Sequence, residues 1–106
     1  MDKLTPYSPP VGLDEQAATR LAELFSTLSD ARRVQIIAAL LSGPMDVQTL
    51  AGIVGISESG VSHHLRGLRQ MHLVRFSKQG RHVIYSIEDE HVADLFRRGL
   101  EHIQHG

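Results

Sequence analysis

The chain has 106 residues, 42% of them hydrophobic, which suits one small domain whose thin core would gain from burial against a second copy. No apolar run reaches the roughly 18 residues of a membrane span, and the start lacks a signal-peptide layout, so we expect a cytoplasmic protein without a membrane partner. The absence of cysteine excludes disulfides and thiolates, leaving imidazole, carboxylate and carbonyl groups as metal ligands.

The first elements follow a proline-rich start. Residues 1–12 hold all but one of the four prolines and predict a flexible arm, ahead of a single domain over residues 13–106. From Leu13 to Leu28, apolar residues recur at steps of three and four, which predicts a first helix.

A second helix is predicted directly after Asp30, which is a suitable N-terminal cap. Its buried stripe is expected to consist of Val34, Ile37 and Leu41. Gly43 and the following proline then end the helix.

The next segment predicts a helix-turn-helix. Asp46 can cap a helix over Val47–Val54, Gly55 permits a tight turn, and Ser57 can cap a second helix at about Glu58–Gln70. This second helix is the candidate recognition helix.

The period then changes from helical to alternating. Val74 and Phe76, followed by Val83, Tyr85 and Ile87, predict a β-hairpin around the turn at residues 78–81. A hairpin after a recognition helix is a wing. A last helix, from about residue 89 to 105, presents a broad apolar face that we expect to pair with its twin. The predicted fold is therefore mainly α with one β-hairpin, a winged helix-turn-helix that dimerises through its N- and C-terminal helices.

The charges favour a nucleic-acid partner, although the formal net charge is only −1. No Asp or Glu occurs from Ser59 to Ile87, and five Lys or Arg residues fall in this window. Such a run alone usually means a solvated face, but here it coincides with the recognition helix and the wing. Candidates for reaching double-stranded DNA from the helix are Ser57, Ser59, Ser62, His63, His64 and Arg66, of which Ser59, Ser62, His63 and Arg66 are preferred. On the wing, Arg75, Lys78 and Arg81 would contact phosphates. The alternative for the adjacent His63 and His64 is that they are exposed residues with a structural role and do not contact DNA.

Four potential metal ligands lie at the spacing D-x-H-x10-H-x2-H, namely Asp89, His91, His102 and His105. Around a helix, the last two histidines lie about 20° and about 40° from His91, so the three imidazoles share one edge. Along the axis, however, His91 and His102 are about 16 Å apart. Because zinc requires nitrogens at about 2.0 to 2.1 Å, one chain cannot close the site.

An antiparallel pair of these helices would bring the two ends together and create two symmetric sites per dimer. Three imidazoles and one carboxylate form a closed four-coordinate set, which suits zinc and also cobalt(II) and leaves no open position for catalysis. The alternative is that these histidines are solvated or complement the helix dipole.

The chain resembles the ArsR/SmtB family of metal-sensing repressors from about Leu13 to His105. The resemblance is carried by LSDARRVQII, SESGVSHHLRGLR, LVRFSKQGRHVIYS and the C-terminal D-x-H-x10-H-x2-H. It implies that Asp89 and His91 of one subunit bind zinc with His102 and His105 of the other. It also implies that the apo dimer binds an inverted-repeat operator and that metal releases it.

The resemblance has further implications. A metal-bound His102 would donate a hydrogen bond from its other ring nitrogen to a backbone carbonyl near His72. This hydrogen bond would hold the imidazole in the orientation that the metal requires. A second, cysteine-based site of some relatives is expected to be absent here, where Asp46 and Thr49 occupy the corresponding positions. Nickel- and cobalt-preferring relatives add ligands from their termini, whereas this sequence stops one residue after His105, which favours four-coordinate metals.

Two other functions are compatible with parts of the sequence. A metal-independent winged-helix regulator would leave the C-terminal histidines without a role. A small zinc hydrolase would need an open coordination position, a general base and a pocket, and the sequence supplies none of these. We therefore expect a non-enzymatic regulator.

Overall fold

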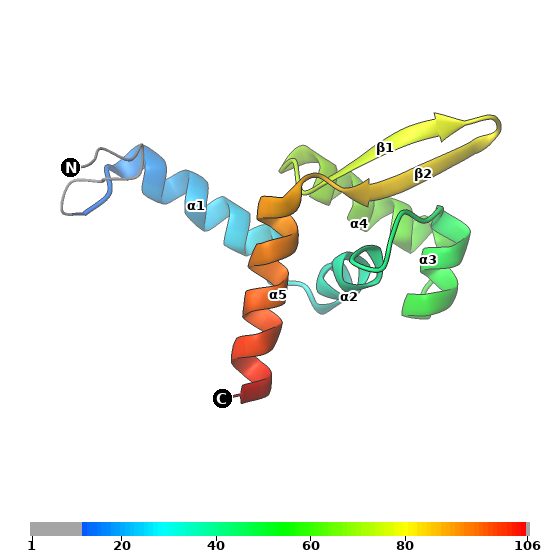
Figure 1. The fold of residues 1–106 in the computed structure, drawn as a ribbon. Helices are drawn as coiled ribbons and strands as arrows, with labels where there is room; N and C mark the ends of the chain where they lie inside the picture. The colour runs from blue at the N-terminus through cyan, green and yellow to red at the C-terminus, as the bar shows by residue number, and fades with distance from the viewer. Residues whose placement is uncertain (1–11, 106) are drawn as a thin grey trace.

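The computed structural model describes residues 12–105, so the arm predicted for residues 1–12 lies outside it except for Gly12. Five helices and one hairpin follow in the predicted order (Figure 1): α1 Glu15–Thr27, α2 Ala31–Leu40, α3 Val47–Val54, α4 Glu58–Gln70, β1 Val74–Gln79, β2 His82–Ile87 and α5 Glu90–His105. The winged helix-turn-helix prediction is confirmed. None of the helices within residues 12–105 combines the length and apolar character needed to cross a membrane.

Capping side chains explain where the helices begin. Asp46 accepts a hydrogen bond from the N–H of Thr49 at 2.8 Å, and Asp30 accepts one from the N–H of Arg32 at the same distance. The backbone N–H and the hydroxyl of Thr49 hold the pKa of Asp46 below its ordinary value. At its other end, α3 stops at Gly55, whose φ of 79° is a left-handed conformation.

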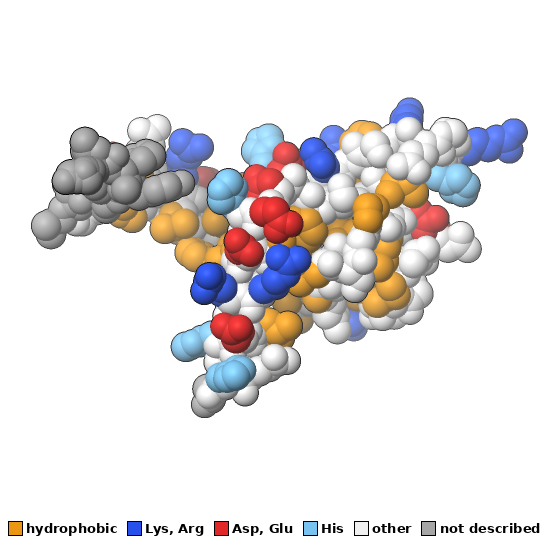
Figure 2. All heavy atoms as spheres, in the orientation of Figure 1, with side chains coloured by type: hydrophobic (Ala, Val, Ile, Leu, Met, Phe, Trp, Pro, Cys, Tyr) orange, Lys and Arg blue, Asp and Glu red, His pale blue; other side chains and the backbone are white. Residues whose placement is uncertain are grey.

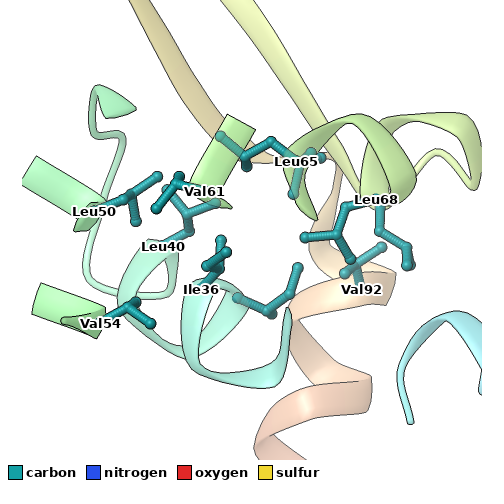
Figure 3. Close-up of a cluster of buried hydrophobic side chains, with 11 residues drawn as sticks. Ile36, Leu40, Leu50, Val54, Val61, Leu65, Leu68 and Val92 are labelled. Carbon is teal, nitrogen blue, oxygen red and sulfur yellow. The ribbon is translucent and has the colours of Figure 1, made fainter. Parts of the chain in front are cut away.

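The core lies between α2, α3, α4 and the start of α5 (Figure 3). Apolar side chains from these helices meet in one cluster, and its fully buried members are Ile36, Ile37, Leu50, Val61, Leu65 and Leu68. Helix α4, which the sequence predicts to be the recognition helix, thus has one face anchored in the core.

The predicted buried stripe of α2 is only partly correct. Ile37 is buried as expected, but Val34 is 39% exposed and the core contacts come from Ile36 and Leu40. The reason is that α2 is apolar on two sides. Its second apolar side, which includes Val34 and Leu41, lines a hollow shared with α1 and α5.

The wing is an antiparallel hairpin in which Val74 pairs with Ile87 and Gln79 with His82. The two-residue loop begins with Gly80 at φ 65°, as a type II′ turn requires. Tyr85 exchanges backbone hydrogen bonds of 2.9 and 2.8 Å with Met45, ahead of α3. The wing is therefore attached to the helix-turn-helix at its base and free at its tip.

Helices α1 and α5 project from this body (Figure 1). Both helices leave large apolar side chains exposed. Helix α1 buries none of its residues. The radius of gyration is 16.0 Å, compared with about 13 Å for a globular chain of this size. A hollow of about 240 Å³ between α1, α2 and α5 has almost entirely apolar walls. The exposed large hydrophobic residues on or beside these two helices are Leu13, Leu21, Phe25, Leu95, Leu100 and Ile103.

Candidate functional site

Helix α4 presents a polar ridge opposite its buried face. Val61, Leu65 and Leu68 are fully buried in the core. Since a helix turns about 100° per residue, the opposite side of α4 carries three of the predicted DNA contacts. These three residues, all exposed, are Ser59, His63 and Arg66. Short polar and cationic groups on an exposed ridge are suited to base edges and phosphates in a major groove.

The N-terminus of α4 carries a second polar group. The Ser57 hydroxyl oxygen accepts a hydrogen bond of 3.0 Å from the N–H of Gly60 and lies 3.1 Å from the hydroxyl of Ser59. The predicted contact Ser57 is therefore also the N-cap of this helix. The positive end of the helix dipole and these hydroxyls together favour an anion such as a phosphate. Ser62 is half-buried one turn further along.

His64 lies away from the ridge, although it was predicted with the DNA contacts. Its half-buried ring is directed toward α2, where Nδ1 accepts a hydrogen bond of 3.2 Å from Nε of Arg33. The neighbouring His63 ring stays exposed, with 5.3 Å between the two ring centroids. Of the adjacent histidines, the structure gives the outward position to His63.

Positive charge also lies on the wing. Lys78, near the end of β1, and Arg81, in the two-residue loop, are exposed, and Figure 2 shows Lys and Arg side chains at the free end of the hairpin. Arg75 lies at its base, where it lines a hollow together with Glu88 and Asp89. The structure thus separates the three predicted wing contacts into two at the tip and one beside the start of α5.

The predicted metal ligands occupy the two ends of α5. At its start, Oδ1 of Asp89 lies 3.6 Å from Nδ1 of His91 and accepts the N–H of Val92 at 3.1 Å. Asp89 thus caps α5 through Oδ1, the oxygen that also lies near His91. The His91 side chain is 94% exposed.

His102 and His105 lie in the last turn of α5, where they line an open hollow with Arg98 and Glu101. Figure 2 shows histidine side chains near both ends of this helix. Eleven residues of helix place His102 about 16 Å from His91. Within residues 12–105, no group of three or more His, Asp or Glu is arranged to hold a metal. Within one chain, the predicted ligands therefore form two separate pairs, and the pairs are too far apart to share one metal ion.

The donor set fits a borderline metal ion. Three imidazoles and one carboxylate are nitrogen and oxygen ligands of the kinds that zinc accepts. All four side chains are exposed, three on α5 and Asp89 directly before it, beside the uncovered apolar face of this helix. A second α5 packed antiparallel on that face would bring an Asp89–His91 pair near a His102–His105 pair.

His72 ends the recognition helix in an unusual conformation. Its φ is 56°, a left-handed value that glycine normally supplies at this position. Its N–H donates to the carbonyl of Arg69 at 2.9 Å, and the N–H of Leu73 donates to the carbonyl of Leu68 at 3.0 Å. These two bonds form a Schellman motif, which fixes the backbone at the end of α4.

Two arginines have positions that the sequence analysis did not assign. The guanidinium of Arg69 lies 4.3 Å from the centroid of the Phe76 ring, between α4 and the wing. Arg33 connects α2 with His64. One signal for Arg33 was available: an isolated glycine inside a helix, here Gly67, often has a packing reason.

The comparisons with known proteins agree with this geometry. Residues 30–75 match the family model described as bacterial regulatory protein, arsR family. The regulator NmtR of Mycobacterium tuberculosis is 39% identical over 92% of this chain and 81% of its own length. A transcriptional repressor SmtB homolog of Synechocystis is 42% identical over 82% and 66%, respectively. A cadmium resistance regulatory protein, the CadC homolog of Staphylococcus aureus, is 37% identical over 85% and 75%.

Solved structures show the same fold. The homodimeric winged helix-turn-helix DNA-binding domain of Mb0332 from Mycobacterium bovis has a TM-score of 0.78 and 28% identity over 91% of each chain. The solution structure of apo-NmtR has a TM-score of 0.77 and 36% identity, and it covers 99% of this chain and 88% of its own.

Proposed function

Because the chain belongs to the arsR family of bacterial regulatory proteins, we propose that it is a metal-responsive transcriptional repressor that binds operator DNA as a homodimer. Family membership assigns the chain to transcriptional regulation and decides against the zinc hydrolase. One observation carries the metal response. Pairs of potential metal ligands lie at the two ends of α5, beside an apolar face that one chain leaves uncovered.

Dimerisation is supported by the surfaces of α1 and α5. Leu21 and Phe25 of α1 are 44% and 53% exposed, and Leu100 and Ile103 of α5 are 46% and 72% exposed. Covering such side chains gains about 25 cal/mol for each Å² of apolar surface. The Mb0332 domain, which has the same fold, is homodimeric. We assign the two helices to a symmetric interface between two copies of this chain.

A symmetric dimer presents two copies of α4 to DNA and would bind an inverted repeat with half-sites about 34 Å apart, or a multiple of that distance. Ser59, His63 and Arg66 would face base edges from the exposed ridge. Lys78 and Arg81 would contact phosphates from the wing, which strengthens binding without specifying the sequence.

Asp89 and His91 of one subunit and His102 and His105 of the other would hold the metal, with two ions per dimer. Bound there, zinc or cobalt(II) would cross-link the two α5 helices at both ends of their interface. The histidines must be neutral to coordinate, so acid weakens the response. The backbone carbonyl near His72, at the fixed end of α4, is the proposed acceptor for the free ring nitrogen of His102, which would link the metal site to DNA recognition.

The proposal is tested by measuring DNA affinity by fluorescence anisotropy at fixed salt, with and without stoichiometric zinc. The probe is an inverted-repeat duplex that the wild-type apo protein selects from random DNA. We expect zinc to weaken binding by wild type and not by His102→Ala. Equal affinities in all four samples would leave a metal-independent regulator. Replacing zinc by cobalt(II) or nickel(II) in the same assay ranks the metals, and linkage requires DNA to weaken metal binding by the same factor.

A further inference from the structure

Arg33, near the start of α2, contacts two other helices, α1 and α4. Its Nε donates to Nδ1 of His64 on α4 at 3.2 Å, and its Nη1 donates to the carbonyl of Thr27, the last residue of α1, at 3.4 Å. Both contacts are partly buried. The planar guanidinium has five donors in a fixed fork, so one side chain can hold two acceptors in a defined mutual orientation.

Gly67 leaves the space that this guanidinium occupies. A Cβ atom built on Gly67 would lie 2.7 Å from Nη2 and 2.9 Å from Cζ of Arg33. Gly67 is three residues after His64, on the same flank of α4. Glycine inside a helix costs about 1 kcal/mol relative to alanine. The position therefore gives up helix stability where a methyl group would displace Arg33.

The Asp30 carboxylate completes the surroundings of Arg33. It caps α2 through the N–H groups of Arg32 and Arg33 at 2.8 and 3.3 Å. Desolvation acts to raise the pKa of Asp30, but these N–H groups, together with the positive charges that His64 and Arg33 can carry nearby, outweigh it, so this pKa lies below its ordinary value. The Asp30 carboxylate and the Arg33 guanidinium therefore attract one another near the start of α2.

We propose that Arg33 is a positioning residue for DNA recognition, which sets the orientation of α4 relative to α1 through His64 and Thr27. This inference rests on the proposed function, in which α4 binds DNA and α1 belongs to the dimer interface. We call the four residues Thr27, Arg33, His64 and Gly67 the Arg33 clamp.

The clamp acts on the geometry of the dimer. The two recognition helices must fit two half-sites at a fixed spacing, and their separation depends on the angle between each α4 and the dimer interface. A clamp that fixes this angle strengthens binding to an inverted repeat. It contributes much less to binding of a single half-site, which only one α4 has to fit.

The hydrogen bond from Arg33 also selects one tautomer of the His64 ring. A ring whose Nδ1 accepts from Arg33 must carry its proton on Nε2. His64 therefore acts in DNA binding through α2 rather than as a base contact. A glutamine at this position retains an acceptor, whereas a leucine of similar size does not.

Gly67→Ala is the most direct test because it displaces Arg33 without removing any charge or hydrogen-bonding group. Helix propensity predicts that this variant is at least as stable as wild type in urea unfolding. We expect affinity for the selected inverted repeat to fall about tenfold, and affinity for a duplex with one intact half-site to fall less than about twofold. Gly52→Ala in α3, where a Cβ meets nothing within 4 Å, is the matched control and is expected to bind both duplexes like wild type.

Variants of Arg33 and His64 distinguish the loss of the hydrogen bonds that orient α4 from the loss of positive charge. Arg33→Lys keeps the charge but has a compact ammonium group that cannot span both acceptors, so it is expected to behave like Gly67→Ala. His64→Gln is expected to keep most of the affinity for the inverted repeat, and His64→Leu to lose it. Inverted-repeat affinity that is unchanged in Gly67→Ala, or equal losses on both duplexes, would overturn the proposal.

A measurement without DNA tests the clamp itself. Nitrogen-15 spectra of the wild-type histidine rings are expected to show the Nε2–H tautomer alone for His64, and to shift in Arg33→Lys toward the mixture of both tautomers found in a solvated imidazole. A wild-type His64 with its proton on Nδ1 would exclude the clamp, whatever the DNA results. If wild type selects no duplex at all, DNA binding as proposed fails, and the ring spectrum still decides on the clamp.

Discussion

Arg69 and Phe76 form a cation–π pair, with the guanidinium carbon 4.3 Å from the ring centroid. This contact joins the recognition helix α4 to the first strand of the wing. An exposed pair of this kind contributes about 0.5–1 kcal/mol. A double-mutant cycle with Arg69→Met and Phe76→Leu, measured by urea unfolding, is expected to give a coupling energy of that size. The same cycle with Arg66→Met in place of Arg69→Met serves as the control, and an equal coupling there would contradict a specific contact.

Adjacent residues of α4 are expected to separate folding from recognition. Leu65 is fully buried, so Leu65→Ala should lower the free energy of unfolding by about 2–5 kcal/mol. Arg66 is exposed on the opposite side, so Arg66→Ala should change stability by less than about 0.5 kcal/mol while weakening DNA binding. Urea unfolding and anisotropy on the same samples check both. An Arg66→Ala protein with wild-type DNA affinity would remove the ridge from the interface.

Lys78 and Arg81 are expected to determine part of the salt dependence of DNA binding. Removing one cationic side chain that pairs with a phosphate should reduce the slope of log affinity against log salt by about 1, with little change in sequence preference. The slope is measured for Lys78→Ala and Arg81→Ala between low and moderate salt. Arg98→Ala, an exposed arginine of α5, should leave the slope unchanged. A wing variant with the wild-type slope would show that the tip does not reach the backbone of the DNA.

The cap of α3 predicts a loss of stability in acid. The pKa of Asp46 is lower in the folded protein than its ordinary value of 3.8. The ionised carboxylate therefore stabilises the fold above that value, and this contribution disappears as the pH falls through the folded pKa. Asp46→Asn keeps an acceptor oxygen but does not titrate, so its urea midpoint should change less than that of wild type between about pH 6 and about pH 3. Asp94→Asn on α5 provides a matched carboxylate, and an equally reduced change there would refute the assignment to the cap.

The helices and strands that are marked by nearby caps, turn residues or apolar periodicity were predicted correctly from the sequence. Helix α3 covers Val47–Val54, as predicted from Asp46 before it and Gly55 after it. The wing also agreed, because alternating apolar residues and a glycine at the turn are properties of neighbouring positions. Caps, turns and periodicity are encoded within a few residues, so they can be read without knowledge of the fold.

Contacts between distant segments were not predictable in this way. Val34 and Ile36 are both apolar and two residues apart, and only the packing of α2 against α3 and α4 decides that Ile36 enters the core. The partnership of Arg33 with His64 spans 31 positions and has no sequence period. The proposed metal site depends on a second chain, since α5 holds its two ligand pairs about 16 Å apart. In that case the spacing predicts the ligands, and the symmetry of a dimer must bring them together.

Mixed dimers test the intersubunit metal site most directly. One chain carries Asp89→Ala and His91→Ala, and the other carries His102→Ala and His105→Ala. Neither chain alone retains a complete site, whereas a dimer of one of each has one intact set of four ligands and one set with none. Zinc titration of tagged, purified dimers is predicted to give two ions per wild-type dimer, none for either variant alone and one for the mixed dimer. Mixed dimers that form but bind no zinc, or a single variant that binds zinc like wild type, would contradict a site shared between subunits.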